Sequence, residues 1–214
     1  MTPENALPTT ALDVSHLPAT QFDHRSPLWW GNLILLFIET AMFGVMIAVF
    51  VTTAMNIRPF PPPRVDRFPV LLHSEPELML PIVGLIALLL SLIPGIWLDL
   101  AARRRDVKAV KILLAITLVF NVALVVIRYY EFDSLHFKWN DNAYGSAVWM
   151  ILGLHMFHLI ALLCEDICLT VWLYARGFDE KHALDVTVAA VYWYWIVGMW
   201  VVLFPIVYLV PRML

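Results

Sequence analysis

The residues best suited to chemistry in this sequence are imidazoles and carboxylates that interrupt an apolar segment, residues 144–174. At about 100° per residue, these side chains share a little over a quarter of one helix face. Ionisable groups in hydrocarbon are costly unless they face protein or water, so this face must pack against something polar. The residues are His155, His158, Glu165 and Asp166, with Tyr144 and Thr170 on the same face.

This polar stripe could bind a metal, relay protons or form a packing seam. His155 and His158 are spaced for one face, but a catalytic metal usually takes three protein ligands, often from more than one element. The remaining histidines lie in the N-terminal tail, in loops or at segment ends, so a haem held between two spans would lack its second histidine. A polar seam satisfied by neighbouring helices or another subunit is therefore favoured.

A carboxylate also interrupts the first apolar segment, where Glu39 lies some eleven residues from the start. A single carboxyl group at that depth is either protonated or hydrogen-bonded to a partner. Two interpretations stay open: a proton-sensitive or lipid-contacting group, and an acid that packs one helix against another.

Charged residues also surround the loop that precedes residues 144–174. Glu131, Asp133 and Asp141 lie there, with Arg128 at the end of the preceding apolar segment. Such groups are most often solvated, so we expect a surface loop with a weak Arg128–Glu131 pair.

The composition places these groups in a membrane protein. Apolar residues make up 61% of the 214 residues, only 14% are charged, and the mean hydropathy is +0.78. The net charge is −3 and no basic run is interleaved with aromatics, so nucleic acid is not an expected partner. No phosphate-binding glycine loop and no nucleophile with an adjacent base is recognisable, so no catalytic residue is predicted.

The hydropathy pattern predicts an all-α fold, a polytopic bundle of five transmembrane helices. A polar tail, residues 1–27, precedes a transmembrane domain, residues 28–214. The predicted spans are residues 28–53, 77–100, 108–130, 144–174 and 186–210.

Lysine and arginine predict the orientation of the bundle. The side that holds the tail and the basic turn at residues 103–111 carries eight of the 14 lysines and arginines. By the positive-inside rule, the N-terminus is cytoplasmic and the C-terminus lies outside.

Several short motifs, in order over residues 29–208, together resemble the conserved core of haem–copper oxidase subunit III. They are Trp29-Trp-Gly31, Ile38-Glu-Thr-Ala-Met-Phe43, Tyr130-Glu-Phe132, Asn142-Ala-Tyr-Gly-Ser146, Gly153-Leu-His-Met-Phe-His158 and Val191-Tyr-Trp193 with Trp200. Five spans resemble the short form of that family, without the two N-terminal helices of the seven-helix form.

The sequence departs from the family pattern in both of its last two spans. Leu152 and Met156 replace the threonine and glycine of the T-G-x-H-G-x-H motif. Tyr194 and Val197 stand where histidine and aspartate are usual in the last helix. The adjacent carboxylates at 165 and 166 are not a pattern of the family.

The resemblance implies an accessory oxidase subunit with no redox centre of its own, in a bacterial-type inner membrane. Haem and copper would lie in partner subunits, with catalytic subunit I as the main partner and phospholipid as a bound component. Glu39, His155 and His158 would be lipid-contacting or proton-influencing. Two other classes remain as alternatives: a haem- or quinone-binding anchor of a respiratory dehydrogenase, and a small proton-coupled transporter.

Overall fold

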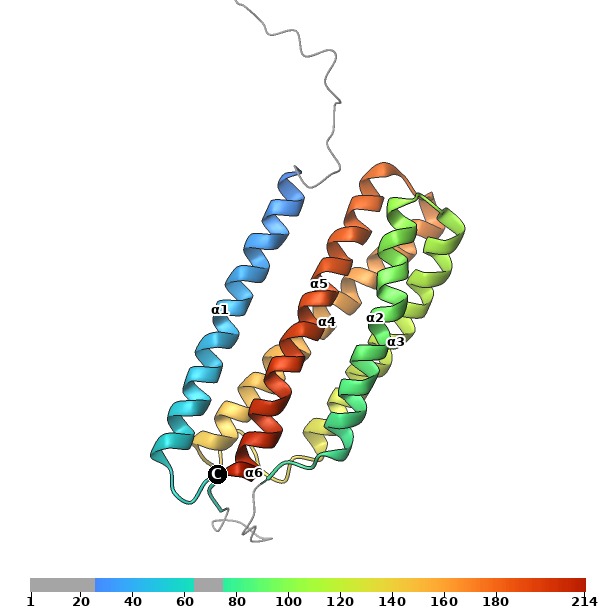
Figure 1. The fold of residues 1–214 in the computed structure, drawn as a ribbon. Helices are drawn as coiled ribbons and strands as arrows, with labels where there is room; N and C mark the ends of the chain where they lie inside the picture. Colours follow the sequence, from blue (N-terminus) through green and yellow to red (C-terminus); the bar gives the residue numbers. More distant parts are fainter. Residues whose placement is uncertain (1–25, 64–74) are drawn as a thin grey trace, which may run out of the picture.

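Five long helices account for most of the chain. The structure is a computed structural model that describes residues 26–63 and 75–214, and these residues contain helices but no strand (Figure 1). All five helices are long and apolar enough to cross a membrane, which confirms the predicted fold class. They are α1 (Pro27–Asn56), α2 (Met79–Arg103), α3 (Val107–Asp133), α4 (Ala143–Arg176) and α5 (Glu180–Phe204), the last continued by a π-helical turn, η1 (Pro205–Leu209), and by α6 (Val210–Met213).

The predicted spans agree with these helices apart from their ends. Most helices extend a few residues beyond the apolar segment, because caps rather than hydropathy set where a helix starts. Asp106, Asn142 and Asp179 each accept a hydrogen bond from the backbone N–H three residues later, which fixes the starts of α3, α4 and α5. At the other end of α4, Gly177 adopts a φ of 90°, a conformation that glycine allows without steric cost.

Four of the helices form a compact bundle and the first helix packs on one side of it. α2 packs on α3 and α5, α3 packs on α4, and α4 packs on α5. α1 packs on α4 and α5, and Figure 1 shows it at the side of the bundle opposite α2 and α3. The start of α1 and the C-terminus lie at opposite ends of the bundle, as an odd number of spans requires (Figure 1).

The buried face of α3 carries both apolar and charged residues. Its buried positions recur at alternating intervals of three and four residues, the spacing of one helix face. This face therefore carries buried polar groups along α3, from the centre of the bundle to one end of the bundle. The buried residues are Val110, Leu114, Thr117, Asn121, Leu124, Arg128 and Glu131.

The end of the last span is not a regular α-helix. Pro205 has no backbone N–H, and the chain forms the π-helical turn at this proline before α6. Both Val207 and Tyr208 of that turn are fully buried. The turn therefore places the Tyr208 side chain in the bundle, beside the charged end of α3.

Candidate functional site

The first polar contact within the bundle joins α1 to α4. His158 Nε2 lies 3.1 Å from Glu39 Oε2, and the His158 side chain is 2% exposed against 20% for Glu39. Phe43, one turn after the glutamate, packs on the imidazole with ring centroids 5.5 Å apart. The structure thus brings together two residues that the sequence singled out separately.

The hydrogen bonds of His158 fix how many protons this pair shares. The His158 Nδ1–H donates to the Leu154 carbonyl at 2.6 Å, so the proton of a neutral imidazole is already on Nδ1. A hydrogen bond between Nε2 and Glu39 then needs one further proton, on the carboxyl group or on the imidazole. Either a protonated Glu39 donates to neutral His158, or an imidazolium donates to a carboxylate.

Aromatic residues of α5 enclose the Glu39–His158 pair. Trp195 lies with its ring centroid 5.1 Å from that of His158, and its Nε1–H donates to Thr40 Oγ1 at 2.8 Å. Tyr192 stacks on Trp195 at 5.8 Å. The Thr40 hydroxyl in turn donates to the Leu36 carbonyl at 2.7 Å, so α1 contacts both α4 and α5 through polar groups.

His155 points to a different set of neighbours from His158. Its Nε2–H donates to the Ile196 carbonyl at 3.2 Å, and Nδ1 accepts from Arg128 Nη2 at 3.3 Å. This arrangement requires the neutral imidazole, since a second ring N–H would face a guanidinium. Both ring nitrogens are engaged, and the side chain is fully enclosed between α3, α4 and α5.

The expectation of a solvated, weak Arg128–Glu131 pair is wrong. Arg128 is 3% exposed and Glu131 1%, and Arg128 Nη1 donates to Glu131 Oε2 at 2.7 Å. The guanidinium lies over the Trp200 ring, 3.6 Å from its centroid, and the Tyr208 hydroxyl donates to the other carboxylate oxygen of Glu131. With His155 these residues form a buried ionic cluster, which we call the Arg128 cluster.

The carboxylates at 165 and 166 lie in separate environments. Asp166 is buried between α3 and α4, where Asn121 Nδ2 donates to its Oδ2 atom. Thr170, one turn later, donates to the Asp166 backbone carbonyl at 2.6 Å. Glu165 is half-buried and borders an open groove of about 270 Å³ that is also lined by Trp172.

Tyr144 occupies an aromatic cluster at the start of α4. Its ring contacts Phe50, Phe60 and Phe137, with centroids 5.1–6.1 Å apart. The side chain is fully buried, and its hydroxyl finds no hydrogen-bond partner among the described residues. The stripe on α4 is therefore divided among an aromatic cluster, α1, the Arg128 cluster and Asn121.

These arrangements favour hydrogen bonding between helices over metal binding. Within residues 26–63 and 75–214, no three histidine, cysteine, aspartate or glutamate side chains converge as a metal site would require. Cys164 and Cys168 are free and exposed on α4. The chemistry that the geometry does support is the sharing and relocation of protons within buried pairs.

Comparison with known proteins identifies related chains along almost the whole sequence. A sequence model of the family described as cytochrome c oxidase subunit III matches residues 14–211. The match covers all five helices and every residue of the polar contacts described above.

Individual relatives agree with that match. The cytochrome c oxidase subunit 3 of Thermostichus vulcanus is 23% identical over 206 residues, which cover 95% of each chain. That of Bacillus sp. (strain PS3) is 26% identical over 184 residues, 84% of each chain. That of Pylaiella littoralis is 33% identical over 96 residues, but the alignment covers 44% of this chain and 35% of that relative.

Proposed function

The chain belongs to the cytochrome c oxidase subunit III family, and from that premise we propose that it is an accessory, non-redox subunit of an aerobic respiratory oxidase that stabilises catalytic subunit I. The observation that carries this proposal is the family match over residues 14–211. The haem and copper of the complex belong to partner subunits, and electrons do not pass through this chain.

The surface of the bundle supports a role in lipid and subunit contact. Large apolar side chains are exposed along the helices, and only 17% of the most apolar window of α1 is buried. Exposed apolar surface of this extent is covered in a membrane by acyl chains or by other subunits. Phospholipid and subunit I are the occupants that we propose.

The Glu39–His158 pair supports an influence on proton uptake. The hydrogen bond between its two side chains needs one proton, and Glu39 keeps a fifth of its side chain exposed at the edge of the bundle. We place the chain in a bacterial-type inner membrane, with its N-terminus in the cytoplasm. Glu39 and His158 lie well inside two membrane-spanning helices, so this pair would lie within the membrane. Its role is to hold a proton and position α1, while His155 has a structural role.

A pull-down of the tagged full chain in mild detergent tests the subunit assignment. The expected result is co-purification of subunits with a reduced-minus-oxidised haem spectrum and oxygen consumption. A colourless chain that associates only with itself would overturn the proposal. A haem spectrum from the isolated chain would instead support the dehydrogenase anchor.

The proton-uptake role has its own test in the purified complex. Glu39→Gln removes one site for the shared proton while keeping the size of the side chain. We expect a lower rate of proton uptake, compared at the same rate of electron transfer, with an unchanged haem spectrum. His136→Gln, at an exposed histidine, is the matched control. Equal uptake in both variants would remove the proton-influencing role and leave the subunit assignment intact.

A further inference from the structure

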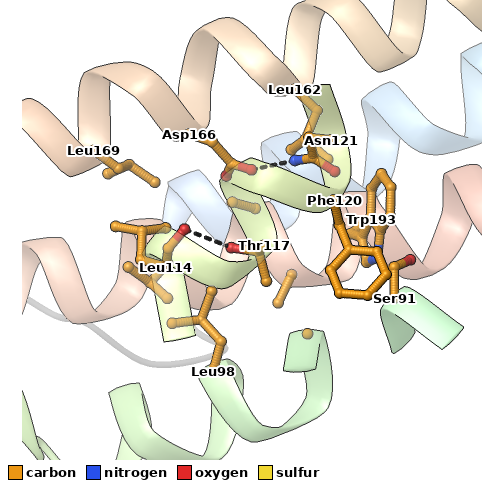
Figure 2. Close-up of a pocket in the computed structure, with 14 residues that line it drawn as sticks. Ser91, Leu98, Leu114, Thr117, Phe120, Asn121, Leu162, Asp166, Leu169 and Trp193 are labelled. Atoms are coloured by element: carbon orange, nitrogen blue, oxygen red, sulfur yellow. Dashed lines mark hydrogen bonds between the residues drawn. The ribbon is translucent and has the colours of Figure 1, made fainter. Parts of the chain in front are cut away.

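A small, partly enclosed cavity lies where α2, α3, α4 and α5 meet, apart from the Glu39–His158 pair. Its volume is about 20 Å³, which is room for one water molecule. Small residues of α2 and α5, among them Gly95 and Ala189, line this space. Figure 2 shows Ser91, Asn121 and Asp166 around it, each from a different helix.

The hydrogen bonds around this cavity leave it rich in acceptors. The Ser91 hydroxyl donates to the Leu88 carbonyl at 2.6 Å, and the Thr117 hydroxyl donates to the Leu114 carbonyl at 3.0 Å. Both hydroxyl hydrogens are thereby committed to their own helices, and Figure 2 draws the bond from Thr117 to Leu114. Asn121 donates to one carboxyl oxygen of Asp166, and no described residue forms a hydrogen bond with the other.

No cation among the described residues lines this cavity. The residues that face Asp166 from α2, α3 and α5 are uncharged, and the neighbouring ionisable group on its own helix is Glu165. Glu165 is acidic, so it adds repulsion to a negative charge at Asp166. A buried carboxylate without a counter-charge is unfavourable, and such a group takes up a proton instead.

We propose that Asp166 is a proton-binding site in the core of the bundle, which holds a neutral carboxylic acid at neutral pH together with one water molecule. The carboxylate gains one proton from the aqueous phase, and no electron or other group is transferred. The resulting O–H donates to the water, and the water donates to cavity oxygens such as Thr117 Oγ1 and Asn121 Oδ1. The two hydrogens of the water thereby satisfy two of the acceptors around the cavity.

The site is independent of the proposed oxidase role. It uses α2, α3, α4 and α5, whereas the Glu39–His158 pair joins α1 to α4. The ligand class is a proton with a water molecule.

Infrared difference spectroscopy tests the protonation of Asp166 directly. The full chain with its co-purifying subunits would be measured in lipid nanodiscs, as wild type and as Asp166→Asn. At neutral pH the wild-type-minus-variant spectrum should contain the carbonyl stretch of a carboxylic acid, lost completely in the variant. Carboxylate bands in its place would overturn the proposal.

Two further variants keep the test decisive if Asp166→Asn fails to fold. Glu165→Gln should retain the carboxylic acid band, because that side chain does not reach the cavity. Asn121→Ser should shift the band without removing it, because it alters the group bonded to Asp166. A band that disappears in Glu165→Gln would assign the proton to Glu165 and overturn the proposal.

Sodium distinguishes a proton site from a cation site at the same oxygens. Replacing potassium with sodium at neutral pH should leave the carboxylic acid band unchanged. Carboxylate bands that respond to sodium would show a bound cation and overturn the proton assignment. Filling the cavity with Ala189→Val should slow deuterium exchange at the carboxylic acid, because the water that carries the exchange has less room. An unchanged exchange rate would show that no such water is bound there.

Discussion

His158 Nε2 and Glu39 Oε2 are 3.1 Å apart, although 119 residues separate the two side chains in the sequence. This contact matters because, among the described helices, α1 packs mainly on α4 and α5 and buries little of its own surface. In a membrane the hydrophobic effect does not drive helices together, so van der Waals packing and interhelical hydrogen bonds carry a larger share. The pair therefore helps to decide where α1 docks.

A double-mutant cycle should detect this docking energy. Glu39→Leu and His158→Leu each leave one partner without its hydrogen bond, so their effects on the free energy of unfolding should not add. We expect a coupling energy of about 1 kcal/mol, the usual worth of an interhelical hydrogen bond. Denaturation in mixed micelles, followed by tryptophan fluorescence, measures it.

The matched control pairs His158→Leu with a substitution that does not touch it. Glu77→Leu lies in the segment before α2, where the carboxylate pairs with the exposed His136. The effects of Glu77→Leu and His158→Leu should simply add. Coupling as large as in the Glu39 cycle would mean that the energies report global loosening rather than the contact.

The oxidase complex should reveal the same contact as a loss of assembly. We expect His158→Leu to lower the yield of the complex several-fold, because a loss of about 1–2 kcal/mol in stability changes abundance by that much. The haem spectrum per complex should stay unchanged, since the imidazole is engaged with Leu154 and Glu39. Normal assembly with a lost haem signal would contradict this prediction and support direct haem ligation.

The Arg128 cluster should be the most sensitive polar group to single substitutions. Arg128→Met leaves Glu131 buried without its counter-charge, and removing one partner of a buried pair costs about 3–5 kcal/mol. Replacing both residues, as Arg128→Met with Glu131→Leu, should recover much of that loss. The test is the folded fraction that remains after heating, measured by size-exclusion chromatography of a fluorescent fusion. We expect the wild type to be most stable, the double variant next and Arg128→Met least.

Two outcomes would separate charge from packing in this cluster. Arg104→Met, at an exposed arginine in the turn after α2, should leave the folded fraction unchanged. A double variant no more stable than Arg128→Met would show that packing of Arg128 on Trp200 dominates, rather than compensation of the Glu131 charge.

The five spans could be predicted from the sequence, but the burial of Arg128 and Glu131 could not. Apolar length is a local property, so the spans follow from hydropathy alone. The charge at the end of α3 is buried by residues distant in the sequence, Trp200 over Arg128 and Tyr208 of the π-helical turn at Glu131, which no local pattern indicates. One signal was available: Arg128 and Glu131 continue the three-and-four spacing of Leu114, Asn121 and the other buried residues of α3.

The candidate site residues can likewise be recognised in the sequence more easily than their hydrogen-bond partners. An ionisable group in an apolar span is conspicuous in any sequence, so Glu39 and Asp166 stood out. Their partners depend on how the helices rotate against each other. Asn121 gives no such signal, because a single amide in a span is an ordinary packing residue, and only the geometry joins it to Asp166.

Two glycines of α4 should respond in opposite ways to alanine. A Cβ atom at Gly145 would lie 2.5 Å from the Lys138 backbone carbonyl oxygen, closer than real contacts allow. At Gly153 a Cβ atom would meet nothing within 4 Å. We expect Gly145→Ala to cost about 1–3 kcal/mol, as overpacking does, because a backbone atom cannot move away cheaply.

Gly153→Ala serves as the control. In the isolated chain it reports helix propensity, and in the complex it reports contact with a partner subunit. Alanine is favoured over glycine within a helix by up to about 1 kcal/mol, so the isolated chain should be unchanged or slightly more stable. Thermal unfolding of both variants, alone and in the complex, makes the comparison. Gly153 is only partly covered by the described chain, and a Cβ atom there would meet no neighbouring helix within 4 Å. If Gly153→Ala weakened only the complex, a partner helix would have to pack closely against that glycine, because small residues permit such contact in membranes.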